Sequence, residues 1–237
     1  MTDEPPVEEA SEDHRIRVGA QRREKTRLRL LQCALPVFAE KGPDAVVIDD
    51  LIAAAGVARG TFYNHFRTTH ELLLELATSM SDEVLRIVDP IALAHTDPVV
   101  RFTTGTRLYM QMALRYPVWG GFITRVGARI ATRGQLIDRY LSRDLESASQ
   151  AGRIQVENVL VARDLVLGSI FYGIETMLLE PTRRHHPEEL VRHVLIGLGL
   201  PPGEAAGIAY LPLPEPGVVD GPFFAGLQQS AGVDQPG

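Results

Sequence analysis

The chain has 237 residues, of which 45% are hydrophobic and 23% charged, and its formal net charge at pH 7 is −6. This length allows one large or two modest domains with a packed core. A single cysteine, Cys33, excludes an intrachain disulfide and suits a reducing compartment. The amino terminus is acidic rather than signal-like, and no apolar run approaches the roughly 20 residues of a membrane span. We therefore expect a cytoplasmic protein.

Charge is distributed unevenly along the chain. Between Arg15 and Arg67, ten Lys and Arg residues stand against five Asp and Glu residues, which gives this segment a net charge of +5 and the remainder −11. A basic segment on an otherwise acidic chain is typical of a DNA-binding domain. We interpret the cations from Arg15 to Arg29 as phosphate contacts, and a solvated helix face is the alternative.

The amino-terminal residues divide into an arm and a helix. Residues 1–20 form an acidic arm that we expect to be disordered, because its start is charged, contains proline and has few large apolar residues. The first helix runs to about Glu40, with Leu31, Leu35 and Phe38 on one face. Pro36 lies inside this helix, where its missing N–H predicts a kink.

The stretch from Ile48 to Phe66, IDDLIAAAGVARGTFYNHF, predicts two short helices joined by a tight turn. The first helix ends at Gly56, since glycine adopts left-handed backbone conformations without a Cβ clash. In the second, from about Arg59 to Phe66, Phe62 and Phe66 are four residues apart and face the same way. Two helices around such a turn are typical of a helix-turn-helix.

The string AGVARGTFYNHF and the RTTHELL that follows it closely resemble the DNA-binding domain of the tetracycline-repressor (TetR) family of bacterial regulators. The resemblance covers about residues 22–73. It implies that the start of the second helix approaches bases, that Tyr63 and His65 hold phosphates, and that Phe62 and Phe66 pack inward. The alternative is that Tyr63 and His65 are ordinary surface residues of a small bundle. The expected DNA-binding residues are Arg27, Val47, Ala58, Arg59, Gly60, Thr61, Tyr63, Asn64 and His65.

Three positions near the turn depart from the family pattern. Ala58 stands where a serine usually caps the recognition helix, a loss that costs on the order of 1 kcal/mol. Val47 stands where a threonine often caps the preceding helix, and Asp49 and Asp50 in its first turn partly compensate through the helix dipole. Thr69 replaces a lysine that usually grips phosphate.

The rest of the chain predicts further helices and no strands. A long helix is expected from Thr69 to about Val88, with a boundary at Asp89-Pro90, and others over about 97–116, 135–151, 158–180 and 187–200. For residues 118–126 we expect a glycine-broken aromatic segment. We predict an all-α protein with a three-helix helix-turn-helix domain (21–68), a larger helical effector-binding and dimerisation domain (69–200) and a Pro/Gly-rich tail (201–237). We expect this tail to be extended or disordered, with Tyr210-Leu211 and Phe223-Phe224 as docking points on the body.

In the resembled family a small effector binds among the middle helices. Large side chains with a few polar neighbours are what such a site needs, although each of these side chains alone is better explained as core. The candidate ligand-binding residues are Phe102, Thr106, Tyr109, Met110, Trp119, Phe122 and Phe171.

The sequence predicts no cofactor, metal site or catalytic residue, because no phosphate loop, nucleophile elbow or HExxH motif is found. His186, Glu189 and His193 share one helix face, where solvated or interface histidines are the better explanation than a metal site. We therefore expect a transcriptional repressor rather than an enzyme. It would form a homodimer through 158–180 and 187–200, bind a near-palindromic operator in double-stranded DNA, and release it when an apolar effector binds. The alternative is a helix-turn-helix protein without an effector.

Overall fold

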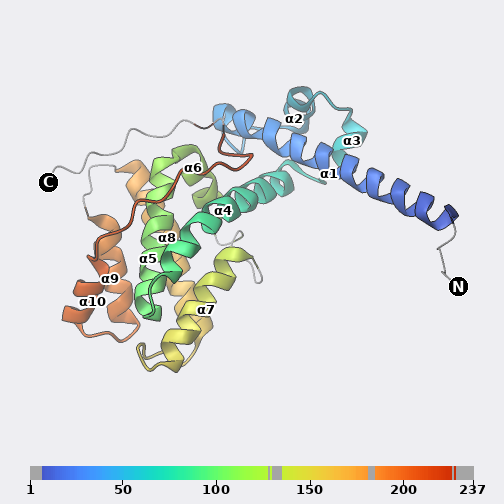
Figure 1. The fold of residues 1–237 in the computed structure, drawn as a ribbon. Helices are drawn as coiled ribbons and strands as arrows, with labels where there is room; N and C mark the ends of the chain where they lie inside the picture. Colours follow the sequence, from blue (N-terminus) through green and yellow to red (C-terminus); the bar gives the residue numbers. More distant parts are fainter. Residues whose placement is uncertain (1–6, 128, 130–134, 181–184, 226, 228–237) are drawn as a thin grey trace, which may run out of the picture. The chain divides into compact units, whose positions relative to one another are not determined.

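The computed structural model describes residues 7–127, 129, 135–180, 185–225 and 227, and every regular element in these ranges is a helix (Figure 1). This confirms the all-α prediction. The chain divides into two compact units, residues 1–73 and 74–237. None of the described helices is both long enough and apolar enough to cross a membrane.

The first unit contains α1 (Val7–Lys41), α2 (Ile48–Ala55), α3 (Arg59–Tyr63) and the start of α4 (Thr69–Leu93). Its helices bury the apolar positions that recur at helical spacing, which builds a core beneath the turn. The buried residues include Leu30, Leu31, Ala34, Leu35, Phe38, Val46, Leu51, Ala55, Phe62 and Phe66.

Helix α1 begins earlier than expected. It is helical from Val7, so most of the arm that we expected to be disordered belongs to this helix. No proline interrupts the chain between Val7 and Leu35, and extending an existing helix adds one hydrogen bond for each residue fixed. The charge pattern at the amino terminus therefore did not decide its conformation.

Helix α4 starts at a well-formed cap and passes through the boundary that we placed at Asp89-Pro90. The Oγ1 atom of Thr68 accepts a hydrogen bond of 3.0 Å from the N–H of Glu71, whose carboxylate accepts one of 2.7 Å from the N–H of Arg67. The helix then continues to Leu93 with Pro90 inside it. Proline removes one backbone hydrogen bond, and here it weakens the helix without ending it.

The second unit is a bundle around α5 (Pro98–Arg115) and α8 (Val159–Leu179), which pack on each other. Both of these helices contact α6 (Pro117–Val126), α7 (Leu136–Gln150) and α9 (His186–Gly197). The segment that we expected to be glycine-broken is thus a helix, α6. Its Gly120 lies against α5, where a Cβ atom would come within 2.6 Å of the carbonyl oxygen of Ala113.

The carboxyl-terminal residues are more ordered than their Pro/Gly content indicated. They form α10 (Pro202–Ala209) and then a coil that runs over the body of the second unit (Figure 1). Val219, Phe223 and Phe224 are buried in this part of the chain, whereas Tyr210 and Leu211 remain exposed. A few large apolar side chains are enough to fix a segment of otherwise loop-like composition.

Candidate functional site

The turn between α2 and α3 has the geometry that its glycine predicts. Gly56 ends α2 in the left-handed region, with φ 60° and ψ 43°. Its N–H donates to the carbonyl of Ala53, and the N–H of Val57 donates to that of Ile52. These bonds satisfy the last carbonyls of α2 and reverse the chain into α3.

Helix α3 divides its residues between a buried and an exposed side. Phe62 and, just beyond the helix, Phe66 are 0% and 1% exposed, so they anchor the helix in the core. Thr61 and His65 are half-buried. The exposed predicted DNA-binding residues are Val47, Ala58, Arg59, Gly60, Tyr63 and Asn64. The side of α3 opposite Phe62 is therefore exposed.

Two ion pairs order the exposed surface around α3. Arg59 donates a hydrogen bond from Nη2 to Asp49 at the start of α2, which raises the pKa of the guanidinium. Lys41 pairs with Asp50 at 2.6 Å, and Asp50 also accepts a hydrogen bond of 3.1 Å from the N–H of Val47. These bonds lower the pKa of Asp50. The cap that Val47 cannot provide is thus compensated by a hydrogen bond to the Asp50 carboxylate, whereas we expected compensation through the helix dipole.

Helix α1 presents cations beside the same surface. Arg23 donates from Nη2 to the carbonyl of Asn64 at 3.1 Å and so holds the end of α3. The guanidinium of Arg27 lies over the Phe66 ring, 4.9 Å from its centroid. Arg17, Arg22 and Lys25 are exposed on the preceding turns of α1. The basic segment of the sequence therefore lies on α1, where Arg23 and Arg27 contact the end of α3 and the other cations are exposed.

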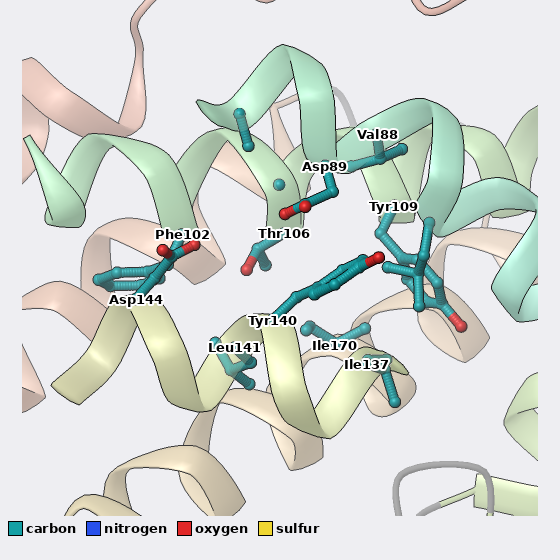
Figure 2. A pocket seen from close by; sticks show the side chains of 13 residues that line it. Val88, Asp89, Phe102, Thr106, Tyr109, Ile137, Tyr140, Leu141, Asp144 and Ile170 are labelled. Atoms are coloured by element: carbon teal, nitrogen blue, oxygen red, sulfur yellow. The ribbon is translucent and has the colours of Figure 1, made fainter. Parts of the chain in front are cut away.

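The second unit contains a cavity between α4, α5, α7 and α8 (Figure 2). The space open to the centre of a water-sized sphere is about 50 Å³, several times the roughly 10–15 Å³ that one water needs. It therefore suits a small molecule of about one ring. The lining residues are Leu85, Val88, Asp89, Ala92, Phe102, Gly105, Thr106, Tyr109, Ile137, Tyr140, Leu141, Asp144 and Ile170.

Polar groups are few in this apolar wall, and two of them belong to an ion network. Arg143 donates to both carboxylate oxygens of Asp89, at 2.7 and 3.1 Å, and to Asp144 at 2.9 Å. Arg101 also donates to Asp144, at 3.0 Å. The network joins α4, α5 and α7 beside the cavity, and its two carboxylates balance its two guanidiniums. Sequence reasoning missed it because its members are far apart along the chain.

Tyr109 connects the cavity wall to α4 by a second contact. Its hydroxyl shares a hydrogen bond of 2.8 Å with the hydroxyl of Ser81, and burial raises the pKa of this phenol. Tyr109 therefore stays neutral at any physiological pH. In Figure 2 the rings of Tyr109 and Tyr140 lie at the same end of the cavity.

The structure separates the ligand-binding residues that we predicted. Phe102, Thr106 and Tyr109 line the cavity, whereas Met110, Trp119, Phe122 and Phe171 do not and are buried in the surrounding packing. The pattern of large side chains marked a core as well as a cavity, because both are built from the same residue types.

The predicted dimer helices differ in the surface that they expose. Val161, Leu165, Tyr172 and Leu179 of α8 are between 45% and 76% exposed, and their spacing of four, seven and seven residues places them on one stripe. Gly168 lies on this stripe with open space beside it, whereas Gly173 faces Leu190 and Met110 inside the subunit. The exposed carboxylates of Asp164 and Glu175 lie at the margin of this otherwise apolar stripe.

Helix α9 carries the histidines whose role the sequence left open. His193 is hydrogen-bonded through Nδ1 to the carbonyl of Glu189, 2.7 Å away, a bond within one helical turn. Among the residues that the structure describes, no group of three or more His, Cys, Asp or Glu side chains is placed to hold a metal ion.

Comparison with known families matches both units. Residues 30–76 match the family described as bacterial regulatory proteins, tetR family, and residues 97–210 match the tetracyclin repressor-like C-terminal domain. Among curated relatives, the chain is 37% identical over 57 residues to the uncharacterised HTH-type transcriptional regulator YvdT of Bacillus subtilis. It is 29% identical over 74 residues to the HTH-type transcriptional repressor KstR2 of Mycolicibacterium smegmatis. These matches cover 24% and 31% of this chain, and 29% and 36% of the respective relatives.

Similarity to solved structures extends over most of the chain. The crystal structure of RolR in complex with resorcinol is 31% identical, with a TM-score of 0.71 over 83% of this chain and 98% of that one. FadR from Bacillus subtilis in complex with stearoyl-CoA shares the fold at 17% identity, with a TM-score of 0.56 over 72% of this chain and 96% of that one.

Proposed function

The chain belongs to the TetR family of bacterial transcriptional regulators, and from this we propose that it is a homodimeric repressor which a small hydroxylated aromatic molecule releases from its operator. The observation that carries the proposal is the cavity of the second unit. Its apolar wall contains the carboxylates of Asp89 on α4 and Asp144 on α7, and both accept hydrogen bonds from Arg143.

DNA recognition is assigned to the exposed side of α3. Arg59 and Thr61 face bases in the major groove, and Tyr63 and His65 hold phosphates. Arg59 is paired with Asp49 in the free protein, so binding exchanges one anionic partner for another. A Cβ atom at Gly60 would meet nothing within 4 Å, which leaves the helix backbone open to a close approach by DNA.

Dimerisation is assigned to the apolar stripe of α8, together with α9. Two copies of the stripe can pack against each other around Gly168, whose lack of a side chain permits close approach of the helices. One recognition helix makes too few base contacts to select an operator, and two related by a twofold axis require half-sites roughly 34–36 Å apart.

The chemistry of the cavity selects the effector class. Its wall is mostly apolar and presents carboxylate oxygens, which accept hydrogen bonds, whereas the guanidiniums that balance them do not line it. A ring with hydroxyl donors therefore fits better than an aromatic carboxylate. Resorcinol, the ligand of RolR, has this chemistry, and RolR is 31% identical to this chain. We therefore choose resorcinol as the test ligand.

Effector binding acts on α4 in this mechanism. A ligand hydroxyl that donates to Asp89 or Asp144 competes with Arg143 for the same oxygens and loosens the tie between α7 and α4. Because Pro90 cannot donate to the carbonyl of Arg86, α4 is already weaker one residue from Asp89. Helix α4 is continuous from Thr69, so a change in its tilt alters the spacing of the two reading heads.

The first experiment is to select binding sites from a random pool of duplex DNA and then titrate the selected complex with resorcinol. The proposal requires a near-palindromic site and weaker DNA binding with ligand. A thermal-shift titration separates the alternative, a regulator without an effector, because a ligand that binds the folded protein raises its melting temperature. A selected operator with no shift for any hydroxylated aromatic favours the alternative.

A further inference from the structure

Residues 211–224, here called the C-terminal strap, are held on the second unit by two arginines of α5. Arg107, whose side chain is 6% exposed, donates to the carbonyl of Leu211 at 2.6 Å and to Glu188 of α9 at 2.7 Å. Arg115 donates to the carbonyl of Pro216 at 3.2 Å. Both arginines bind main-chain oxygens, so they fix the path of the strap at Leu211 and Pro216.

A row of aromatic rings links the strap to the effector cavity. The Phe224 ring lies edge-on to Tyr116 and Trp119, with centroid distances of 4.8 and 5.9 Å. Trp119 in turn lies edge-on to Tyr109, 5.1 Å away, and Tyr109 lines the cavity. Neither Phe224 nor Trp119 lines the cavity. Such edge-to-face pairs add about 0.5–1.5 kcal/mol beyond area burial, so each ring helps to orient the next.

The strap also closes over a carboxyl group of α4. Phe223 donates its N–H to Glu83, which is 8% exposed. Gly221 packs so closely on this carboxyl that a Cβ atom there would overlap it. Oε2 of Glu83 has no hydrogen-bond partner in the described part of the chain. The strap thus shields the Glu83 carboxyl from water and offers it the Phe223 N–H as a hydrogen-bond donor in return.

We propose that Phe224 is a positioning residue for the effector cavity: the strap, closed over Glu83, holds Trp119 and through it Tyr109 in the cavity wall. The inference rests on the proposed function for its consequence, because Tyr109 matters to regulation only if the cavity binds the effector. The strap sets the position of Tyr109 whether or not a ligand binds.

Ionisation of Glu83 makes the closed strap sensitive to pH. Burial raises the pKa of Glu83 to about 7. The nearby charge of Asp220 on the strap acts in the same direction, while Arg86 on α4 and the Phe223 N–H oppose it. Opening the strap would expose the acid and return its pKa toward the ordinary value. The equilibrium constant for closing the strap is therefore highest below the ordinary pKa of a glutamic acid. It falls as the pH rises through about 7, by roughly tenfold between pH 6 and pH 8.

The test uses the full-length protein labelled with 3-fluorotyrosine, with the Tyr109 resonance assigned through Tyr109→Phe. Trp119 is the only tryptophan, so its quenching by acrylamide reports closure of the strap. Phe224→Ala should at least double the quenching constant and shift the Tyr109 resonance. Val218→Ala, at an exposed strap position, should change neither. In the unmutated protein both signals should titrate near pH 7, and in Glu83→Gln, which stays neutral, both should be flat.

An unchanged Tyr109 resonance in Phe224→Ala would overturn the proposal, as would a titration that persists in Glu83→Gln. Resorcinol affinity is measured separately on the same proteins. If the unmutated protein binds resorcinol, Phe224→Ala should weaken binding at least threefold, and equal affinity would also refute a positioning role. If the unmutated protein does not bind resorcinol, the effector class is wrong, while the fluorine and quenching results still decide the role of the strap.

Discussion

The guanidinium of Arg59 donates a hydrogen bond to the carboxylate of Asp49, so the first residue of the recognition helix is tied to α2 when no DNA is bound. The pair lies on the surface, where exposed ion pairs contribute little to stability. We propose that its significance lies in competition, because Asp49 pairs with the guanidinium that we assign to DNA contact.

Asp49→Asn should therefore strengthen binding to duplex DNA severalfold at low salt, since it frees Arg59 and removes a negative charge near phosphates. Fluorescence anisotropy across a salt series measures the effect. Glu40→Gln removes the same charge from an exposed position of α1 and serves as the control. An equal gain in both variants would show that only net charge matters.

Gly60 allows stability and DNA binding to be separated. Alanine meets no atom at this position, so Gly60→Ala should stabilise the free protein by roughly 0.5–1 kcal/mol. The added methyl group should nevertheless weaken operator binding if, as we propose, the helix backbone approaches DNA closely at this residue. Gly207→Ala, in the open middle of α10, should stabilise the protein and leave binding intact. Denaturant unfolding and anisotropy provide the two measurements, and unchanged binding in Gly60→Ala would refute the close approach.

The Asp89–Arg143 contact is the link that we assign to effector release. Asp89→Asn should weaken it in the absence of ligand, lowering operator affinity by roughly fivefold or more and reducing the further effect of resorcinol. Glu204→Gln removes a carboxylate paired with Arg153, away from the cavity, and should leave both properties unchanged. Operator affinity equal to that of the unmutated protein would show that α4 is not held through this contact.

Tyr172 tests the dimer surface because it is 75% exposed in the single chain. Tyr172→Arg should cost the subunit little stability but should place two like charges at the centre of the α8 stripe, giving monomers in sedimentation at micromolar concentration. Val218→Arg changes another exposed apolar residue outside the stripe and should remain dimeric. A Tyr172→Arg protein that stays dimeric would move the interface away from α8.

The sequence predicted best what depends on local spacing. Gly56 with Phe62 and Phe66 located the helix-turn-helix, because a left-handed residue and an i, i+4 apolar pair are local requirements. The sequence was a poorer guide where contacts between distant parts of the chain determine whether a segment is helical. Pro90 lies inside α4 rather than ending it, and residues 202–209 form helix α10 in a segment whose Pro/Gly content indicated no helix.

The cavity shows the same limit. Phe102, Thr106 and Tyr109 line it, and they were predicted because large side chains with polar neighbours gather in the middle helices, where the resembled family binds its effector. Asp89, Tyr140 and Asp144 were not, since only the folded chain brings α4 and α7 together. Trp119 was assigned to the ligand from its size, but it packs one ring away from the cavity wall.

The most direct test of ligand-controlled repression is the affinity of the unmutated protein for its selected operator, measured by anisotropy with and without saturating resorcinol, with benzoate as the anionic comparison. We expect two protomers per site and an affinity lowered roughly 5- to 150-fold by resorcinol, with little change by benzoate. Operator affinity that is the same with resorcinol bound as without it would contradict the account.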